Sequence, residues 1–269
     1  MMTDPSILFR EEINRIGKVA GYLWDRGWAE RNGGNLSVRL ALPEEDLPPR
    51  PETADRHPLP MEFPRLAGEV FYITGAGRRM RDVAGEPLAH GCILRISDNS
   101  RTYSILSAKE IVPSSELASH LLIHADAVTR STGARAVLHT HPSELIALSH
   151  CPPFLDPRHL TRTLWSMIPE CRIVVPRGVG VVPYMLTGTV SLAEATIRHL
   201  AHHDVLIWEK HGVLSVTKDI EECFDVIDTL VKAARIYLDA RATGSEPQGL
   251  TNGQLEELAA AFGLPPFPL

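Results

Sequence analysis

The chain has 269 residues, 44% of them hydrophobic, which is enough to bury a full core in one large or two small domains. Its 27 basic and 33 acidic residues give a formal net charge of −6, which argues against a general nucleic-acid binder. Four scattered cysteines without C-x-x-C spacing indicate reduced thiols. The sequence shows no signal-peptide pattern and no apolar run long enough to span a bilayer, so we expect a soluble, cytoplasmic protein.

The N-terminal part of the chain is predicted to hold a helix, a strand and a long loop. Apolar residues recur at three- and four-residue steps over 5–26, which predicts an amphipathic helix. The turn Asn32–Asn35 leads into a strand over 36–40. Seven prolines within 41–65 indicate an irregular loop. Because both flanks of this loop read as strands of one sheet, we interpret it as an insertion within a single domain covering 1–269.

Two glycine turns are candidate anion sites. A turn such as Asn32–Asn35 is most often a plain connection, but its glycines let backbone N–H groups approach a phosphate and its asparagines add donors. The second turn, Gly75–Arg79, follows a predicted strand over 70–74 and adds arginine charge. A predicted hairpin over 92–97 and 101–106 follows it.

A helix is predicted over 113–130, opened by serines that can cap it. Glu116 falls in its first turn, where a glutamate is usually only a favourable charge against the helix dipole. His120 and His124 lie four residues apart, a spacing that also suits a metal. Because no glutamate follows His120 as in the H-E-x-x-H pattern, we interpret this pair as mainly structural.

The stretch 136–142 is predicted to be a short strand that stops on two histidines before Pro142. Residues two apart on an extended chain point to the same side, so His139 and His141 present two imidazoles to one face. Two imidazoles suit a divalent transition metal, and a catalytic zinc usually takes a third protein ligand. His211, at a predicted turn between two strands, is the best third candidate, although a separation of about 70 residues along the chain has no diagnostic meaning.

The remaining chain alternates helices with strands. The stretch 169–176 is predicted to lead into a strand that continues at 178–182, and 205–216 reads as two strands joined by a turn. Capping signals and apolar periodicity predict the remaining helices over 143–149, 158–167, 191–202, 219–241 and 251–262.

Six motifs, taken in this order, resemble the class II aldolase/adducin family. They are Glu30–Leu36, Ile73–Gly77, Pro113–Leu117, His139–His141, Pro176–Gly180 and Lys210–Gly212. The resemblance extends over nearly the whole chain, and the set of motifs is specific for the family. It implies an α/β fold, with one domain built on a central, mainly antiparallel β-sheet that helices cover on both faces.

The resemblance also implies residue roles. His139, His141 and His211 would bind one zinc ion per subunit, which would act as a Lewis acid on the carbonyl of a ketose phosphate. Glu116 would be the acid/base that exchanges the proton on the dihydroxyacetone phosphate carbon, and Glu170 would handle the proton on the aldehyde-side oxygen. The residues that would bind the phosphate are Asn32, Gly34, Asn35, Gly77 and Ser115.

The stretches 30–35 and 169–172 resemble the family members that cleave L-rhamnulose 1-phosphate into dihydroxyacetone phosphate and L-lactaldehyde. Such members are typically homotetramers with sites at subunit interfaces. Ala76 departs from the resemblance, because these enzymes commonly carry serine there and the phosphate pocket loses one hydroxyl donor. Arg78 is a candidate to compensate for that loss.

Several alternatives stay open at this point. The substrate of an aldolase could instead be L-fuculose 1-phosphate or a 5-deoxypentulose 1-phosphate. Glu116, directly after two serines, favours an aldolase over a related epimerase, whereas a related dehydratase uses the same histidines and a glutamate. A non-catalytic, adducin-like module is disfavoured because all three histidines and Glu116 are retained.

Overall fold

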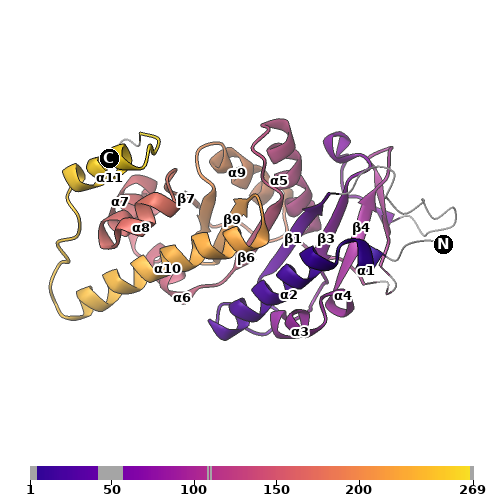
Figure 1. The fold of residues 1–269 in the computed structure, drawn as a ribbon, viewed down its shortest axis with the longest axis horizontal. Coiled ribbons are helices and arrows are strands. Elements are labelled where there is room, and N and C mark those ends of the chain that lie inside the picture. Colours follow the sequence, from indigo (N-terminus) through magenta and orange to yellow (C-terminus); the bar gives the residue numbers. More distant parts are fainter. Residues whose placement is uncertain (1–4, 42–56, 108, 110, 267–269) are drawn as a thin grey trace.

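Nine strands form one sheet in the computed structural model, which describes residues 5–41, 57–107, 109 and 111–266 (Figure 1). Their order is β2-β5-β4-β3-β1-β6-β9-β8-β7, and all neighbours are antiparallel except the parallel pair β7 and β8. This confirms the predicted mainly antiparallel sheet. The strands are β1 (Asn35–Leu40), β2 (His57–Pro58), β3 (Val70–Thr74), β4 (Gly91–Ile96), β5 (Thr102–Ile105), β6 (Ala136–Thr140), β7 (Val179–Val182), β8 (Val205–Trp208) and β9 (Gly212–Thr217).

Helices cover both faces of this sheet, as Figure 1 shows. Helices α2, α3, α6, α7, α8 and α10 share one large apolar cluster with the first face, and α5 and α9 pack against the other. The helices are α1 (Pro5–Leu8), α2 (Arg10–Asp25), α3 (Met80–Gly85), α4 (Pro87–His90), α5 (Leu117–Thr129), α6 (Ser143–Ser149), α7 (Pro157–Met167), α8 (Pro169–Val174), α9 (Val190–Leu200), α10 (Ile220–Ala242) and α11 (Asn252–Ala261), with short 3-10 helices η2 (Pro64–Leu66) and η3 (Pro152–Leu155).

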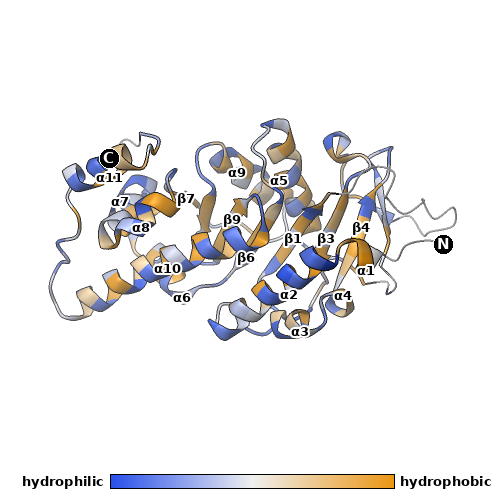
Figure 2. Ribbon diagram, in the orientation of Figure 1, coloured by the Kyte–Doolittle hydropathy of each residue, from blue (hydrophilic) through white to orange (hydrophobic). Residues whose placement is uncertain are grey.

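The period of two along each strand decides which face a residue enters. On β1, Leu36 and Val38 join the large cluster beneath α2 and α10, whereas Ser37 points to α5 and contacts it. On β3, Tyr72 joins the large cluster and Phe71 joins a second one beneath α5. Figure 2 shows the consequence, with hydrophobic colour along the strands and hydrophilic colour on the outward side of α2.

Antiparallel pairing brings four segments that are distant along the chain to the same end of neighbouring central strands. The start of β1 at Asn35 pairs with His139, near the end of β6. The end of β3 at Thr74 lies beside the start of β1, and the start of β9 at Gly212 lies beside the end of β6. His211 immediately precedes β9. The motifs identified in the sequence therefore meet at the end of the sheet where strands β3 and β6 end and strands β1 and β9 begin.

The stretch 169–176, which was expected to lead into a strand, is helical over Pro169–Val174 (α8), and the strand that follows, β7, begins at Val179. Pro169 takes the first helical position, where its missing N–H is not needed. Cys171 is buried in the large cluster, and the guanidinium of Arg172 packs 4.2 Å over the Trp165 ring. Tertiary packing therefore outweighs the β-propensity of the Ile-Val-Val run.

Three helix starts differ from prediction. The helix expected over 5–26 is divided at Phe9 into α1 and α2. Helix α5 begins at Leu117, so Glu116 occupies the N-cap position instead of the first turn. The side chain of Thr189 caps α9 by accepting from the N–H of Leu192. Helix α5 thus begins four residues after the expected start at Pro113, and α9 begins one residue before the expected start at Ser191.

Part of the predicted proline-rich loop, residues 42–56, lies outside the described residues. The part that is described, 57–65, contains the two-residue strand β2 and the start of η2. Among the described helices, none combines the length and the apolar character needed to cross a membrane.

Candidate metal centre and acid/base site

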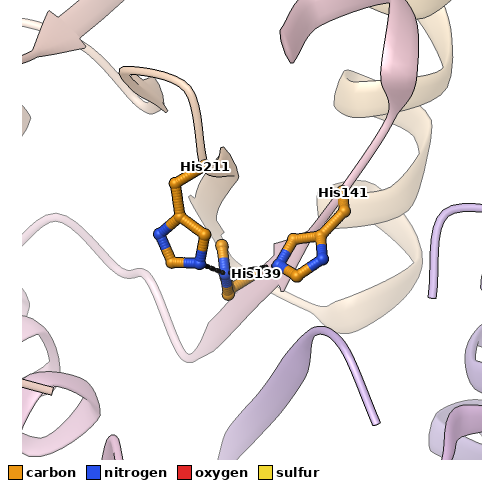
Figure 3. Close-up of side chains that lie close together, drawn as sticks. All are labelled: His139, His141 and His211. Carbon is orange, nitrogen blue, oxygen red and sulfur yellow. Dashed lines mark hydrogen bonds between the residues drawn. The ribbon is translucent and has the colours of Figure 1, made fainter. Parts of the chain in front are cut away.

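Three histidine side chains converge where strand β6 ends and strand β9 begins. Figure 3 shows the ring of His139 between those of His141 and His211. The Nε2 atom of His139 lies 3.2 Å from Nε2 of His141 and 3.3 Å from Nε2 of His211. One ring nitrogen from each residue thus falls within 4.8 Å of the others, and the described chain has no second cluster of three or more such ligand groups.

Hydrogen bonds fix which ring nitrogen is free in two of these histidines. Nδ1 of His139 lies 3.0 Å from the carbonyl oxygen of Val213, and Nδ1 of His141 lies 2.8 Å from Oε1 of Glu30. Because a carbonyl and a carboxylate only accept, Nδ1 carries the proton in both neutral rings. Each Nε2 then directs a lone pair into the shared centre. Three imidazole nitrogens facing one point fit a divalent transition metal such as zinc.

Burial keeps the rings of His139 and His211 in the neutral form that a metal ligand needs. Desolvation lowers the pKa of His139 well below its ordinary value, and the neighbouring histidines lower it further. Desolvation likewise lowers the pKa of His211 to about 4. The protein fold therefore disfavours protons at the centre in the acidic range where exposed histidines are charged.

Two glycines make this close approach of backbones and rings feasible. A Cβ at Gly212 would lie 2.6 Å from the Thr140 carbonyl oxygen and 2.8 Å from ring atoms of His139 and His141. Gly34 has a φ of +75°, and a Cβ there would lie 2.8 Å from the carbonyl oxygen of His139. Any larger residue at either position would push the metal ligands apart.

The segment after α2 anchors His141. The carbonyl of Trp28 accepts from the His141 N–H at 2.9 Å and from Oγ1 of Thr140 at 2.7 Å. This places the exposed Glu30 carboxylate against Nδ1 of His141. The sequence alone predicted no role for Glu30. Its position at the start of the Glu30–Leu36 motif was the available signal, but only the fold shows which side chain it orients.

Glu116 is a buried carboxyl near the metal centre. Its Oε2 accepts from Nδ2 of Asn35 at 3.0 Å, and its backbone N–H donates to Oγ of Ser114 at 3.2 Å. Burial raises the pKa of Glu116, while the Asn35 hydrogen bond and the charge of His141 oppose that rise. A carboxyl under these opposing influences takes up a proton more readily than an exposed glutamate does, and it can return that proton.

The two glycine turns lie close to this carboxyl. The N–H of Ala76 donates to the carbonyl of Val112, and the N–H of Ser114 donates to that of Thr74, so the second turn lies against the segment before Glu116. Gly77 has a φ of +67° and open space around it. Of the other residues predicted to bind phosphate, Asn32 and Ser115 are exposed. The side-chain amide of Asn35, in contrast, is already hydrogen-bonded to Glu116 and His120.

Glu170 stands apart from this cluster. It is exposed in the first turn of α8, which packs against α7, α10 and α11. Figure 1 shows these elements together near the C-terminal end of the chain. Within the described residues no hydrogen bond or ion pair joins Glu170 to the histidines or to Glu116.

The chain is similar in sequence to known proteins. The family model described as "Class II Aldolase and Adducin N-terminal domain" matches residues 14–238. The chain is 44% identical to a rhamnulose-1-phosphate aldolase of Bacteroides thetaiotaomicron over 95% of each chain. It is 36% identical to one of Enterococcus faecalis, over 94% of this chain and 92% of that one.

Solved structures show the same fold. A sugar-phosphate aldolase from Thermotoga maritima has a TM-score of 0.77 and 32% identity, with 90% of this chain and 99% of that chain covered. A structure described as L-fuculose 1-phosphate aldolase has a TM-score of 0.64 over 98% and 99% of the two chains, and its 19% identity supports likeness of fold alone.

The Glu30–His141 contact predicts an effect on metal affinity. Glu30→Gln keeps the side-chain size but removes the carboxylate that fixes the His141 ring, so we expect metal affinity to fall roughly 10- to 100-fold. Competition with a calibrated chelator measures this, with the exposed Glu86→Gln as the matched control. Equal affinities in the two variants would contradict the orienting role.

His120 of α5 predicts an acid-dependent loss of stability. Burial lowers the pKa of His120 from 6.5 to about 3 in the folded protein. The unfolded chain therefore binds more protons between these values, and the free energy of unfolding falls as the pH drops through this range, by up to about 1.4 kcal/mol per pH unit for one histidine. Urea unfolding between pH 4 and 7 should show a shallower loss in His120→Gln, and parallel slopes would refute this.

Proposed function

The chain belongs to the class II aldolase and adducin family, and we propose that it catalyses the reversible cleavage of L-rhamnulose 1-phosphate into dihydroxyacetone phosphate and L-lactaldehyde. The observation that carries this proposal is the convergence of three histidine Nε2 atoms near one buried carboxyl, that of Glu116. The relatives named rhamnulose-1-phosphate aldolase, which match nearly the full length of both chains, support the choice of sugar.

We propose zinc, one ion per subunit, as the metal of this centre. The donor set of His139, His141 and His211 is all imidazole nitrogen, and three protein ligands leave a side open for substrate, as in catalytic zinc sites. When bound, such an ion supplies a Lewis acid that polarises the ketose carbonyl and stabilises negative charge on its oxygen.

Glu116 carries the proton chemistry at carbon. In the cleavage direction the bond between C3 and C4 breaks, and its electron pair moves toward the polarised carbonyl at C2. Glu116 then gives a proton to C3, which completes dihydroxyacetone phosphate. In synthesis the same carboxylate removes that proton. Its burial raises its pKa, so that the protonated form needed for cleavage is more accessible than in an exposed glutamate.

The phosphate would lie between the two glycine turns. The open space at Gly77 and the exposed positions of Asn32 and Ser115 support this placement. Arg78 is exposed on the same turn and can supply the charge that compensates for the missing hydroxyl at Ala76.

We propose that the site is completed across a subunit interface in a homotetramer. The proton on the C4 hydroxyl must leave as the aldehyde forms, and Glu170 is the family-matched residue for this step. Because Glu170 is exposed on α8 and not joined to its own subunit's cluster, Glu170 of the partner subunit is the residue we assign to the adjacent site.

The substrate and the metal can be tested together. We expect cleavage of L-rhamnulose 1-phosphate to exceed that of L-fuculose 1-phosphate and of a 5-deoxypentulose 1-phosphate by at least about tenfold in kcat/KM, because stereochemistry at C4 changes the contacts on which transition-state binding depends. Coupled detection of dihydroxyacetone phosphate measures the rates. Removal of metal by a chelator should abolish cleavage, and zinc should restore it.

Either of two results would overturn this assignment. Equal or faster cleavage of the fuculose ester would reject the sugar. Full activity in chelated protein shown to be metal-free would reject the metal centre.

A mixed-subunit experiment tests the shared site. Glu116→Gln and Glu170→Gln should each be nearly inactive alone. In tetramers assembled randomly from equal amounts of both, about one quarter of the sites would combine an intact Glu116 with an intact Glu170 from the neighbour. Recovery of activity toward that fraction supports the shared site. No recovery, with mixing verified by native mass spectrometry, would place both residues in one subunit's site.

A further inference from the structure

A continuous chain of hydrogen-bonded side chains leads from the protein interior to Glu116. It runs from Nε2 of His124 to Oγ of Ser37 (2.9 Å), from that oxygen to Nδ1 of His120 (2.7 Å), and from Nε2 of His120 to Oδ1 of Asn35 (2.5 Å). Nδ2 of Asn35 then reaches Oε2 of Glu116 at 3.0 Å. We call the set His124, Ser37, His120 and Asn35 the buried chain.

The donor in each link of the buried chain follows from chemistry. A carboxylate only accepts, so the amide nitrogen of Asn35 donates to Glu116 and its oxygen is turned to His120. That oxygen also only accepts, so Nε2 of His120 carries the proton. In a neutral ring Nδ1 then accepts, and Ser37 donates to it. The Ser37 oxygen is left to accept from Nε2 of His124. All four bonds therefore point toward Glu116.

The rings of the buried chain are held neutral, as this direction requires. Burial lowers the pKa of His120 to about 3 and that of His124 well below its ordinary value. The charge of Arg39 on β1 adds to the effect on His124. Neither ring can turn around by taking up a second proton near neutral pH, so the amide of Asn35 stays in one orientation.

The position of the buried chain shows that packing alone does not account for it. Ser37 faces α5 between two apolar clusters, one containing Phe71 and Leu121 and the other containing Ile123 and Val137. His120 and His124 are each 2% exposed. Polar groups inside such a core cost stability unless every one is satisfied, and apolar residues would fill the same space without that cost.

We propose that His120, backed by Ser37 and His124, is a positioning residue for the acid/base Glu116, acting through the amide of Asn35. This rests on the proposed function, in which Glu116 transfers the proton at C3. It also gives Asn35 a different task from phosphate binding. Its oxygen and one of its two N–H groups are already used within the buried chain.

The experiment compares three variants of the full-length, metal-loaded protein. His120→Phe keeps a ring but removes both nitrogens. His120→Gln places an amide nitrogen at about the reach of Nε2 and can restore the donor to Asn35. Leu121→Ala, at a fully packed neighbouring position on α5, lowers stability without touching the buried chain, and serves as the control for a merely structural effect.

The measurement is exchange of deuterium from solvent into dihydroxyacetone phosphate, which needs proton transfer but no aldehyde. We expect His120→Phe to lower the maximal exchange rate at least about tenfold while the half-saturating concentration changes less than about threefold. His120→Gln should recover most of the rate. Leu121→Ala should lower Tm yet retain the rate. Crystal structures should show Asn35 turned away from Glu116 in the Phe variant only.

Two results would overturn the proposal. One is an exchange rate in His120→Phe within threefold of the wild type. The other is an unchanged Asn35–Glu116 contact in the crystal structure of that variant. Should His120→Phe fail to fold, Ser37→Ala replaces it, since loss of that hydroxyl frees the His120 ring to change tautomer. Absence of exchange in the wild type would instead reject the proposed function, and the crystal structures would still decide whether His120 orients Asn35.

Discussion

The structure depends on the antiparallel pairing of β1 with β6, which sets Asn35 opposite His139. This register brings the start of one strand to the end of the other, and with it two of the sequence motifs. A slip of one residue would turn Ser37 away from α5 and into the apolar cluster beneath α2 and α10. The large apolar area on that side therefore secures the polar contacts on the opposite side.

The same pairing explains how three imidazoles can face one another. Lone pairs pointed at a common centre repel, and free side chains would rotate apart. Here Nδ1 of His139 and of His141 is held by a hydrogen bond, and Gly212 leaves no slack between the two rings. The energy that holds the ligands comes from sheet pairing and core burial rather than from the ligands themselves. Such preorganisation lowers the cost of binding a metal.

The sequence predicted the strands and turns that carry the site better than it predicted the surrounding helices and the side-chain contacts between them. The strand that carries His139 and the turn that carries His211 were predictable because apolar runs and glycines mark them. Helix α8 was not, because β-branched residues of its last turn imitate a strand while its packing on Trp165 is a tertiary effect. The hydrogen bond between Ser37 and His120 joins residues that lie 83 positions apart in the sequence, and no local sequence pattern predicts such a contact.

Glu116, the proposed acid/base, depends on support from the core. It stands at the N-cap of α5, where the chain leaves regular structure, and its side chain does not cap the helix. Burial alone would raise its pKa and favour the protonated form. The Asn35 amide, which His120 holds in place, donates to the Glu116 carboxylate; this hydrogen bond opposes the rise in pKa and also selects one rotamer of Glu116. The side-chain amide of Asn35 could by itself adopt either of two flipped orientations. The buried, neutral ring of His120 keeps one tautomer, and its Nε2–H therefore selects the orientation in which the Asn35 oxygen faces His120. The helix that begins directly after Glu116 thus also carries, one turn later, the residue that orients its carboxyl through Asn35.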